Sequence, residues 1–170
     1  MGESHPIRAT NPYGQNKIDI ENILLNDPYF KGDCSVKILR YFNPIGAHPS
    51  GLIGENPKGI PNNLMPYILN VANREYKTVS VFGDDYETHD GTGVRDYIHI
   101  MDLVDGHIKA LNYQKKGISI FNLGTGQGYS VLELIKTFEN VNHVSVPFKI
   151  SARRLGDVAS VYANPYRAES

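Results

Sequence analysis

The feature that most constrains the fold of this chain is an alternation of strand-like and helix-like segments. The segment SVKILRYFN (35–43) is rich in β-branched and aromatic residues and predicts a strand. Further strands are predicted for VSVFG (79–83), VRDYIHI (94–100) and ISIFNLG (118–124), and helices for 11–27, 62–73, a segment from Asp102 to Leu111 and a segment from Ser130 to Phe138. Strands that alternate with helices predict an α/β fold with parallel strands.

Local signals predict where the helices begin. Pro12 lies in the first turn of the first helix, Asp102 is a predicted N-cap, and Ser130 with Glu133 forms a capping-box pattern. Three of these helices are expected to have an apolar face, made of Ile20, Ile23 and Leu24 in the first, of Leu103, His107, Ala110 and Leu111 in the third, and of Val131, Leu134, Ile135 and Phe138 in the fourth.

Composition excludes several classes of function. The 170 residues are 41% hydrophobic with a net charge of -1, which predicts a globular domain with no general attraction for nucleic acid or an anionic membrane surface. The single cysteine, Cys34, allows no internal disulfide and indicates a reducing cytoplasm. The histidines show no metal-ligand spacing, and no apolar run approaches the roughly 20 residues of a membrane span. We therefore expect a cytoplasmic protein without a metal site.

A long Gly/Pro-rich loop runs from Pro44 to Pro61. Loops of this length are uncommon in compact domains unless they shape or cover a site. A plain surface excursion is the alternative.

Tyr13 and Lys17 lie four residues apart at the start of the first predicted helix, within NPYGQNK. Residues at this spacing share one helix face, so a phenol and an ammonium can address the same ligand. A nearby cation favours a phenolate, which suits removal of a proton from a sugar hydroxyl. A solvated helix face is the alternative.

The glycine-rich segment GTGQGYS (124–130) follows a predicted strand and precedes a predicted helix, as a dinucleotide-binding loop does. The third glycine of that motif would fall at position 129, which is tyrosine, and no carboxylate follows about 20 residues later. We therefore expect a tight strand-to-helix turn rather than a phosphate cradle.

Arginines are the better candidates for holding an anion. Arg95 follows a glycine-rich stretch, and Arg154 precedes Asp157, which suits a ribose or sugar hydroxyl. A surface Arg–Asp pair is the alternative. Asparagines 43, 62 and 63 can both donate and accept hydrogen bonds, as sugar recognition requires, although asparagine beside Pro and Gly also suits turns.

Taken in order, these motifs resemble those of the UDP-glucose 4-epimerases, a family of the extended short-chain dehydrogenase/reductase superfamily. The similarity runs through NPYGQNK, ILRYFNPIGAHPSGLIGENPKGIPNNLMPYI, VFGDDYETHDGTGVRDYIHIMDLVDGHIKAL, FNLGTGQGYSVLELI and RRLGDVASVYANP. The RYFNPIGAH and DGTGVRDYIH blocks are specific to the epimerases, whereas the Tyr/Lys pair is shared by the superfamily.

The resemblance implies roles for individual residues. Tyr13 would be the acid/base on the sugar 4-hydroxyl, and Lys17 would bind the nicotinamide ribose of NAD and activate that tyrosine. Tyr41, Phe42 and Asn43 would lie along the nicotinamide and the substrate, and Asn62, Asn63 and Leu64 would hold the sugar and diphosphate. The backbone at Ser80, Val81 and Phe82 would contact the uracil, Arg95 and Arg154 would bind the phosphates, and Asp157 would bind the uridine ribose. Tyr97 would also contact the substrate, and Val161 would lie beside the sugar 2-substituent.

The resemblance also implies the fold: the C-terminal portion of an NAD-binding Rossmann-like fold, with the smaller substrate-binding domain. Residues 1–43 and 100–139 would belong to the Rossmann-like part, and 44–99 and 140–170 to an interleaved UDP-sugar-binding part. Family members are about twice as long, so the N-terminal NAD-binding half would be absent. Strands at RYFN and FNLG would then be left with exposed edges.

The function implied is UDP-glucose 4-epimerase, which interconverts UDP-galactose and UDP-glucose with enzyme-bound NAD. This chain would be a fragment that is inactive alone, from a family whose full-length members are homodimers. Val161 would also allow UDP-N-acetylhexosamines. The alternatives are a non-catalytic UDP-sugar-binding remnant and a sister sugar-nucleotide dehydratase or decarboxylase.

Overall fold

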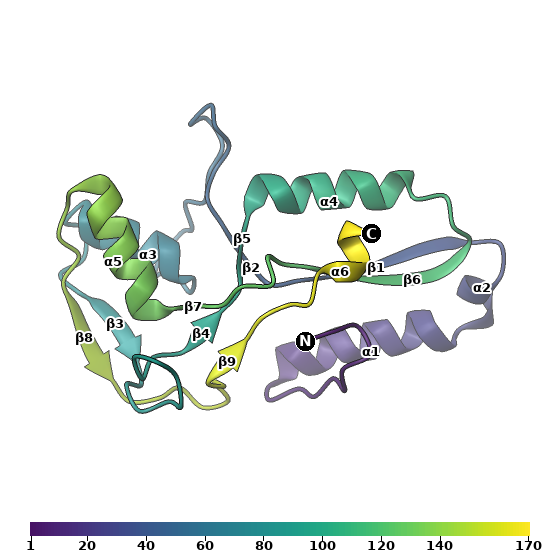
Figure 1. Cartoon of the computed structure of the whole chain (residues 1–170), viewed down its shortest axis with the longest axis horizontal. Coiled ribbons are helices and arrows are strands. Elements are labelled where there is room, and N and C mark those ends of the chain that lie inside the picture. The colour runs from purple at the N-terminus through teal and green to yellow at the C-terminus, as the bar shows by residue number, and fades with distance from the viewer.

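A computed structural model describes all residues of the chain, 1–170, and contains six helices and nine strands (Figure 1). The helices are α1 (Pro12–Asn26), α2 (Pro28–Lys31), α3 (Leu64–Ala72), α4 (Ile100–Asn112), α5 (Val131–Asn142) and α6 (Tyr166–Glu169). The strands are β1 (Ser35–Tyr41), β2 (Asn43–Ile45), β3 (Val79–Phe82), β4 (Val94–Arg95), β5 (Tyr97–His99), β6 (Gly117–Leu123), β7 (Tyr129–Ser130), β8 (Phe148–Ser151) and β9 (Ser160–Val161).

The predicted parallel α/β class is confirmed, although the strands form small separate sheets. β1 pairs with β6, β2 with β5 and β3 with β8, all in parallel. In the remaining sheet, β4 lies between β9, which is parallel to it, and β7, which is antiparallel. The predicted strand 94–100 is thus interrupted at Asp96, where the chain passes from β4 to β5.

The longest strands, β1 and β6, lie between two helices, with α4 on one face and α1 on the other (Figure 1). Towards α1, the Arg40 guanidinium donates through Nε to Glu21 at 3.0 Å. Towards α4, Leu123 packs with Ile98 and Leu103 in a small buried cluster. Because β1 and β6 each pair with one strand only, each keeps the unpaired edge that the sequence predicts.

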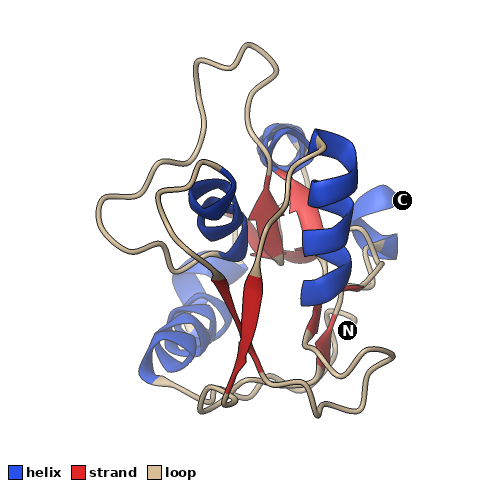
Figure 2. Cartoon of the chain, turned by 90° about the vertical axis from the view of Figure 1, so that its left-hand side faces the viewer, coloured by secondary structure: helices blue, strands red, loops and turns tan.

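A second apolar core lies at the other end of the molecule, where α3 and α5 cover β3 and β8 (Figure 2). Its fully or almost fully buried members are Ile68, Val71, Val79, Val81, Ile135 and Val146. The expected domain division, which places residues 100–139 in the Rossmann-like part, stays a prediction. Helix α5 packs in this second core.

Several expectations about the helices are wrong in detail. α4 begins at Ile100 and is capped by His99, whose Nδ1 accepts from the Met101 N–H at 3.2 Å, so the expected cap Asp102 lies in the first turn. Leu111 is 82% exposed, and Ile20 and Ile23 of α1 are also exposed. Sequence spacing identifies an apolar face but does not show whether anything packs against it.

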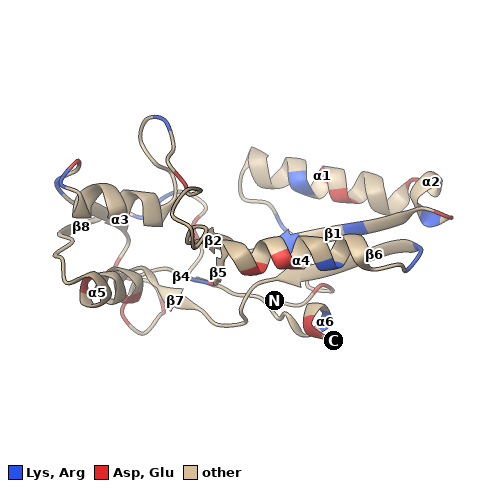
Figure 3. Ribbon diagram, turned by 90° about the horizontal axis from the view of Figure 1, so that it is seen from above, with Lys and Arg blue, Asp and Glu red and all other residues tan.

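Helix α4 carries charged residues of both signs (Figure 3), and Lys109 pairs with Asp105 one turn earlier at 2.8 Å. None of the helices has the length and apolar character required to cross a membrane. His, Cys, Asp and Glu side chains form no group of three or more that could hold a metal ion.

Candidate functional site

A cleft with a volume of about 490 Å³ lies where five separated segments of the chain converge. These segments are 43–45, 60–67, 79–86, 93–97 and 154–157, and Val131 of α5 completes the lining. The predicted site residues that line the cleft are Asn43, Asn62, Asn63, Leu64, Ser80, Phe82, Arg95, Tyr97, Arg154 and Asp157.

Two guanidinium groups and one carboxylate give part of the cleft a net positive charge. Arg154 donates through Nε to Asp157 Oδ2 at 2.9 Å, and Arg95 Nη2 lies 3.9 Å from Asp157 Oδ1. The Arg154 guanidinium also lies over the Phe82 ring, 4.8 Å from its centroid. The Arg–Asp pair considered as an alternative therefore exists, but it lies in the cleft, where it orients both arginines towards the same space.

Tyr97 contributes a buried phenol to the cleft. Burial raises the pKa of Tyr97 above its ordinary value, and the nearby Arg95 guanidinium only partly offsets this effect. The phenol therefore stays protonated at neutral pH and is available as a hydrogen-bond donor.

Tyr13 and Lys17 come together on α1, as their spacing predicts. The Lys17 ammonium lies 5.2 Å from the centroid of the Tyr13 ring, and the tyrosine is 72% exposed. Neither residue lines the cleft, but the segment just before their helix contacts its rim. Thr10 Oγ1 donates to the Gly156 carbonyl at 3.4 Å, and Gly156 lies between Arg154 and Asp157 in the sequence.

Four further predicted site residues, besides Tyr13 and Lys17, do not line the cleft. The Tyr41 ring lies 6.1 Å from that of His107 in α4. Successive strand residues point to opposite faces, so Tyr41 lies on the face of β1 away from α1. The other three are Phe42, which is half-buried, Val81, which is buried in the second core, and Val161, whose backbone pairs with Arg95.

Sequence reasoning missed several residues of the cleft. Tyr86 lies in the wall with a buried hydroxyl that has no hydrogen-bond partner, and the Arg153 guanidinium lies 4.1 Å from its ring centroid. No sequence signal identified it. Both ends of the long loop also line the cleft, through Pro44, Ile45, Ile60 and Pro61, while its middle extends away from the other elements (Figure 2). Loop length was the signal for these residues.

The glycine-rich turn is a strand-to-helix turn, as expected. Its N–H groups at Thr125 and Gly126 donate to the carboxylate of Asp96, at 2.9 and 3.0 Å. Gly126 adopts a left-handed conformation with φ of +77°, which suits glycine. Since an internal carboxylate fills this turn, it offers no site for the pyrophosphate of a dinucleotide.

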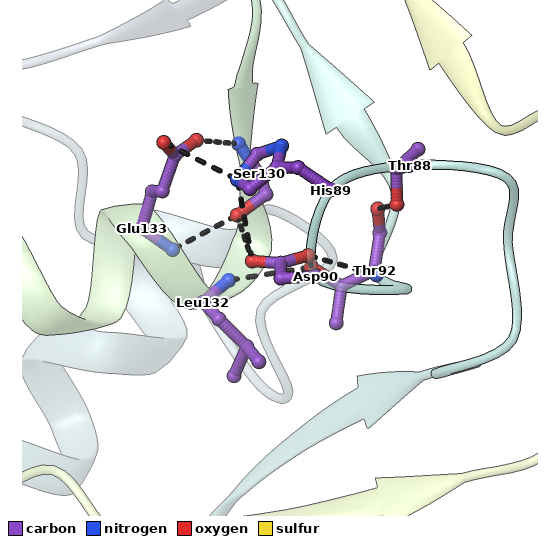
Figure 4. Close-up of polar contacts among 7 residues, drawn as sticks. All are labelled: Thr88, His89, Asp90, Thr92, Ser130, Leu132 and Glu133. Carbon is purple, nitrogen blue, oxygen red and sulfur yellow. Dashed lines mark hydrogen bonds and ion pairs between the residues drawn. The ribbon is translucent and has the colours of Figure 1, made fainter.

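Beside one wall of the cleft, a polar network connects residues 88–92 with the start of α5 (Figure 4), and Thr92 and Ser130 within it are fully buried. The Asp90 carboxylate accepts from the Ser130 hydroxyl and, at 2.7 Å, from the Thr92 hydroxyl, while His89 lies 3.3 Å from Glu133. Thr92 and Ser130 each precede a cleft residue, Gly93 and Val131 respectively, and the Val131 N–H donates to the Gly93 carbonyl at 3.2 Å. The network therefore fixes the backbone of that wall.

The fold and the cleft together define a class: α/β proteins of the extended short-chain dehydrogenase/reductase type, with a Tyr/Lys helix and an arginine-lined cleft. A family model described as "NAD dependent epimerase/dehydratase family" matches residues 1–124. The chain belongs to this family.

Within this family, the chain is similar to several UDP-glucose 4-epimerases. The chain is 56% identical to a UDP-glucose 4-epimerase of Pasteurella multocida over 95% of its own length, and 54% identical to that of Bacillus subtilis over 98%. A crystal structure of the Bifidobacterium longum UDP-glucose 4-epimerase in complex with NAD+ and UDP superposes with a TM-score of 0.95 at 50% identity. The chain covers 48% and 50% of the two relatives and 51% of that structure, so it spans about half their length.

Proposed function

We propose that this chain supplies the UDP-sugar cleft and the acid/base tyrosine of a UDP-glucose 4-epimerase, which interconverts UDP-galactose and UDP-glucose. The observation that carries the proposal is the convergence of Asn43, Asn62, Arg95, Arg154 and Asp157 on one cleft, although they are far apart in sequence. The names of the similar proteins support the same assignment.

In the proposed mechanism, the cleft holds the nucleotide and α1 supplies the proton transfer. Arg95 and Arg154 bind the diphosphate, because planar guanidinium groups match phosphate oxygens. Asp157 accepts from the uridine ribose. Tyr13 takes the proton of the sugar 4-hydroxyl and later returns it, and the Lys17 ammonium favours the ionised phenol during this exchange.

NAD, when bound, supplies the acceptor and donor of the hydride at sugar C4. The exposed Tyr13 and Lys17 fit the nicotinamide end of NAD, whereas the glycine-rich turn is filled by Asp96 and does not fit the pyrophosphate. We therefore expect the 170-residue chain to bind UDP but not to turn over UDP-galactose unaided. Turnover by the pure chain, followed as UDP-glucose formation, would contradict this.

Calorimetric titration with UDP tests the proposed cleft. We expect saturable binding by the wild-type chain and binding at least about tenfold weaker for Arg154→Ala, since hydrogen bonds between charged groups are lost. Arg8→Ala, at an exposed arginine with no ion pair, is the matched control and should bind UDP normally. Equal loss in both variants, or no binding by the wild type, would refute the proposal.

A second candidate function is UDP-sugar binding without catalysis. It is favoured by the glycine-rich turn, whose N–H groups donate to the internal carboxylate of Asp96 and are not available to the pyrophosphate of NAD. Binding of UDP together with absence of turnover, even when the N-terminal half of a relative is added, would favour this second function.

Two finer proposals concern the full-length protein. We propose that Val161 leaves room for an N-acetyl group, so that UDP-N-acetylhexosamines are also bound. Rejection of these ligands in a competition titration against UDP would contradict it. We also propose a homodimer, which sedimentation of the full-length protein would test.

A further inference from the structure

Asp96 is a fully buried carboxylate that makes no ion pair with a lysine or arginine. Its Oδ1 accepts from the Thr125 N–H at 2.9 Å and from the Thr125 hydroxyl at 2.7 Å. Its Oδ2 accepts from the N–H groups of Gly126 and Ala163, each at 3.0 Å. Four donors thus satisfy the charge that burial would otherwise make costly.

The backbone of Asp96 makes two further hydrogen bonds that link it to the cleft. Its N–H donates to the Val161 carbonyl at 3.1 Å, and its carbonyl accepts from the Asn43 N–H at 3.0 Å. The residues on either side of it, Arg95 and Tyr97, both line the cleft, as does Asn43. One residue therefore joins β2, the glycine-rich turn and the C-terminal segment behind the cleft.

We propose that Asp96 is a positioning residue of the cleft, and that its carboxylate acts as an internal anion occupying the glycine-rich turn. The consequence for UDP rests on the proposed function above. With the carboxylate in place, Asn43, Arg95 and Tyr97 are held in one arrangement before any ligand arrives, which lowers the entropy lost on binding.

The turn has the features of an anion-binding backbone. A side chain at Gly124 would place its Cβ 2.6 Å from Asp96 Oδ2 and 2.7 Å from the Ala163 Cβ, so only glycine allows this approach. Consecutive N–H groups beside a residue in the left-handed conformation form a concave anion site. This explains why the segment resembles a phosphate loop in sequence.

Asp96→Ala tests the proposal because it leaves a gap about the size of formate beside three N–H donors. We expect a lower midpoint of thermal unfolding, faster amide hydrogen exchange in peptides that contain Asn43 and Tyr97, and UDP binding weakened by at least about tenfold. Sodium formate should restore most of each loss, whereas equal sodium chloride should not. Asp102→Ala, an exposed carboxylate, is the matched control and should not respond to formate.

Asp96→Asn preserves the shape but replaces one acceptor oxygen by a donor, so it should lose UDP affinity without rescue by formate. If Asp96→Ala folds only when formate is present, its formate-dependent circular dichroism supports the proposal directly. Thr125→Val, which removes one donor, is a milder variant and should show a few-fold loss of affinity.

Normal exchange at Asn43 and Tyr97 in the folded Asp96→Ala variant, or instability that formate does not relieve, would overturn the proposal. Failure of the wild-type chain to bind UDP would instead refute the proposed function. Hydrogen exchange and formate rescue of stability would still decide the role of Asp96, because neither needs UDP.

Discussion

Replacement of Ser130 by alanine tests the polar network behind the cleft. The Ser130 side chain is fully buried and its hydroxyl has two roles. It caps α5 by accepting from the Glu133 N–H at 3.0 Å, and it donates to the Asp90 carboxylate (Figure 4). Ser130→Ala removes both interactions without adding any atom that could clash.

The size of the effect follows from these two contacts. Loss of a serine N-cap costs about 1 kcal/mol, and loss of a hydrogen bond to a charged group costs about 1.5–3 kcal/mol. We therefore expect the free energy of unfolding at pH 7 to fall by about 3 kcal/mol, which for a chain of this size lowers the unfolding midpoint by about 6–12 °C.

The loss of stability in Ser130→Ala should depend on pH, because the hydrogen bond from Ser130 is strong only while Asp90 is ionised. Burial opposes ionisation of Asp90, but hydrogen bonds from Ser130 and Thr92 and the nearby His89 outweigh burial and hold its pKa below the usual range. A lowered pKa contributes stability above the unfolded value, and this contribution disappears as the pH falls through the folded pKa. The difference between wild type and variant should therefore shrink below about pH 4.

Urea unfolding followed by circular dichroism, at several pH values from about 7 down to about 2, measures this dependence. Ser145→Ala is the matched control because Ser145 is exposed and its side chain makes no hydrogen bond, so it should change stability by less than about 0.5 kcal/mol. A loss at pH 7 no larger than in this control, or a loss that does not vary with pH, would refute the reasoning.

Two further variants test other parts of the site. Gly124→Ala should destabilise the chain by about 2–3 kcal/mol, because the added Cβ would clash with the buried Asp96 carboxylate and the Ala163 Cβ. Gly54→Ala is the control, since its Cβ would make only an ordinary van der Waals contact and should leave stability nearly unchanged. Equal midpoints of thermal unfolding for the two variants would contradict this prediction. Because burial raises the pKa of Tyr97, its stabilising contribution is complete below about pH 10 and is lost as the pH rises through the folded value. Tyr97→Phe should therefore lose less stability than wild type as the pH rises from about 10 to about 11. Absorbance of the wild-type tyrosines should include one step at higher pH that is absent from Tyr97→Phe, and titration curves without this difference would contradict the prediction.

Much of the fold could be predicted because its signals are local. The capping box of Ser130 and Glu133 forms as the sequence predicts, and the β-rich segment 35–43 contains β1 and the first residue of β2. Burial was harder to predict, since it depends on what packs against a face. Ile20 and Ile23 repeat at helical spacing, yet both are exposed. Asp96 lies within the predicted strand 94–100, but in the structure its buried carboxylate accepts hydrogen bonds from two distant segments.

The sequence alone determined the types of the longer helices and strands, the family and the Tyr13–Lys17 pair, because each depends on residue order or on spacing within one helix. Only the tertiary structure decided that segments around Asn43, Phe82, Arg95 and Arg154 line a common cleft, since their proximity depends on how β2, β3 and β4 pair with distant strands. It also decided that the glycine-rich turn holds an internal carboxylate. Hydrogen bonds between residues far apart in sequence leave no periodic pattern, so no spacing rule could identify Asp96 as the anion in that turn.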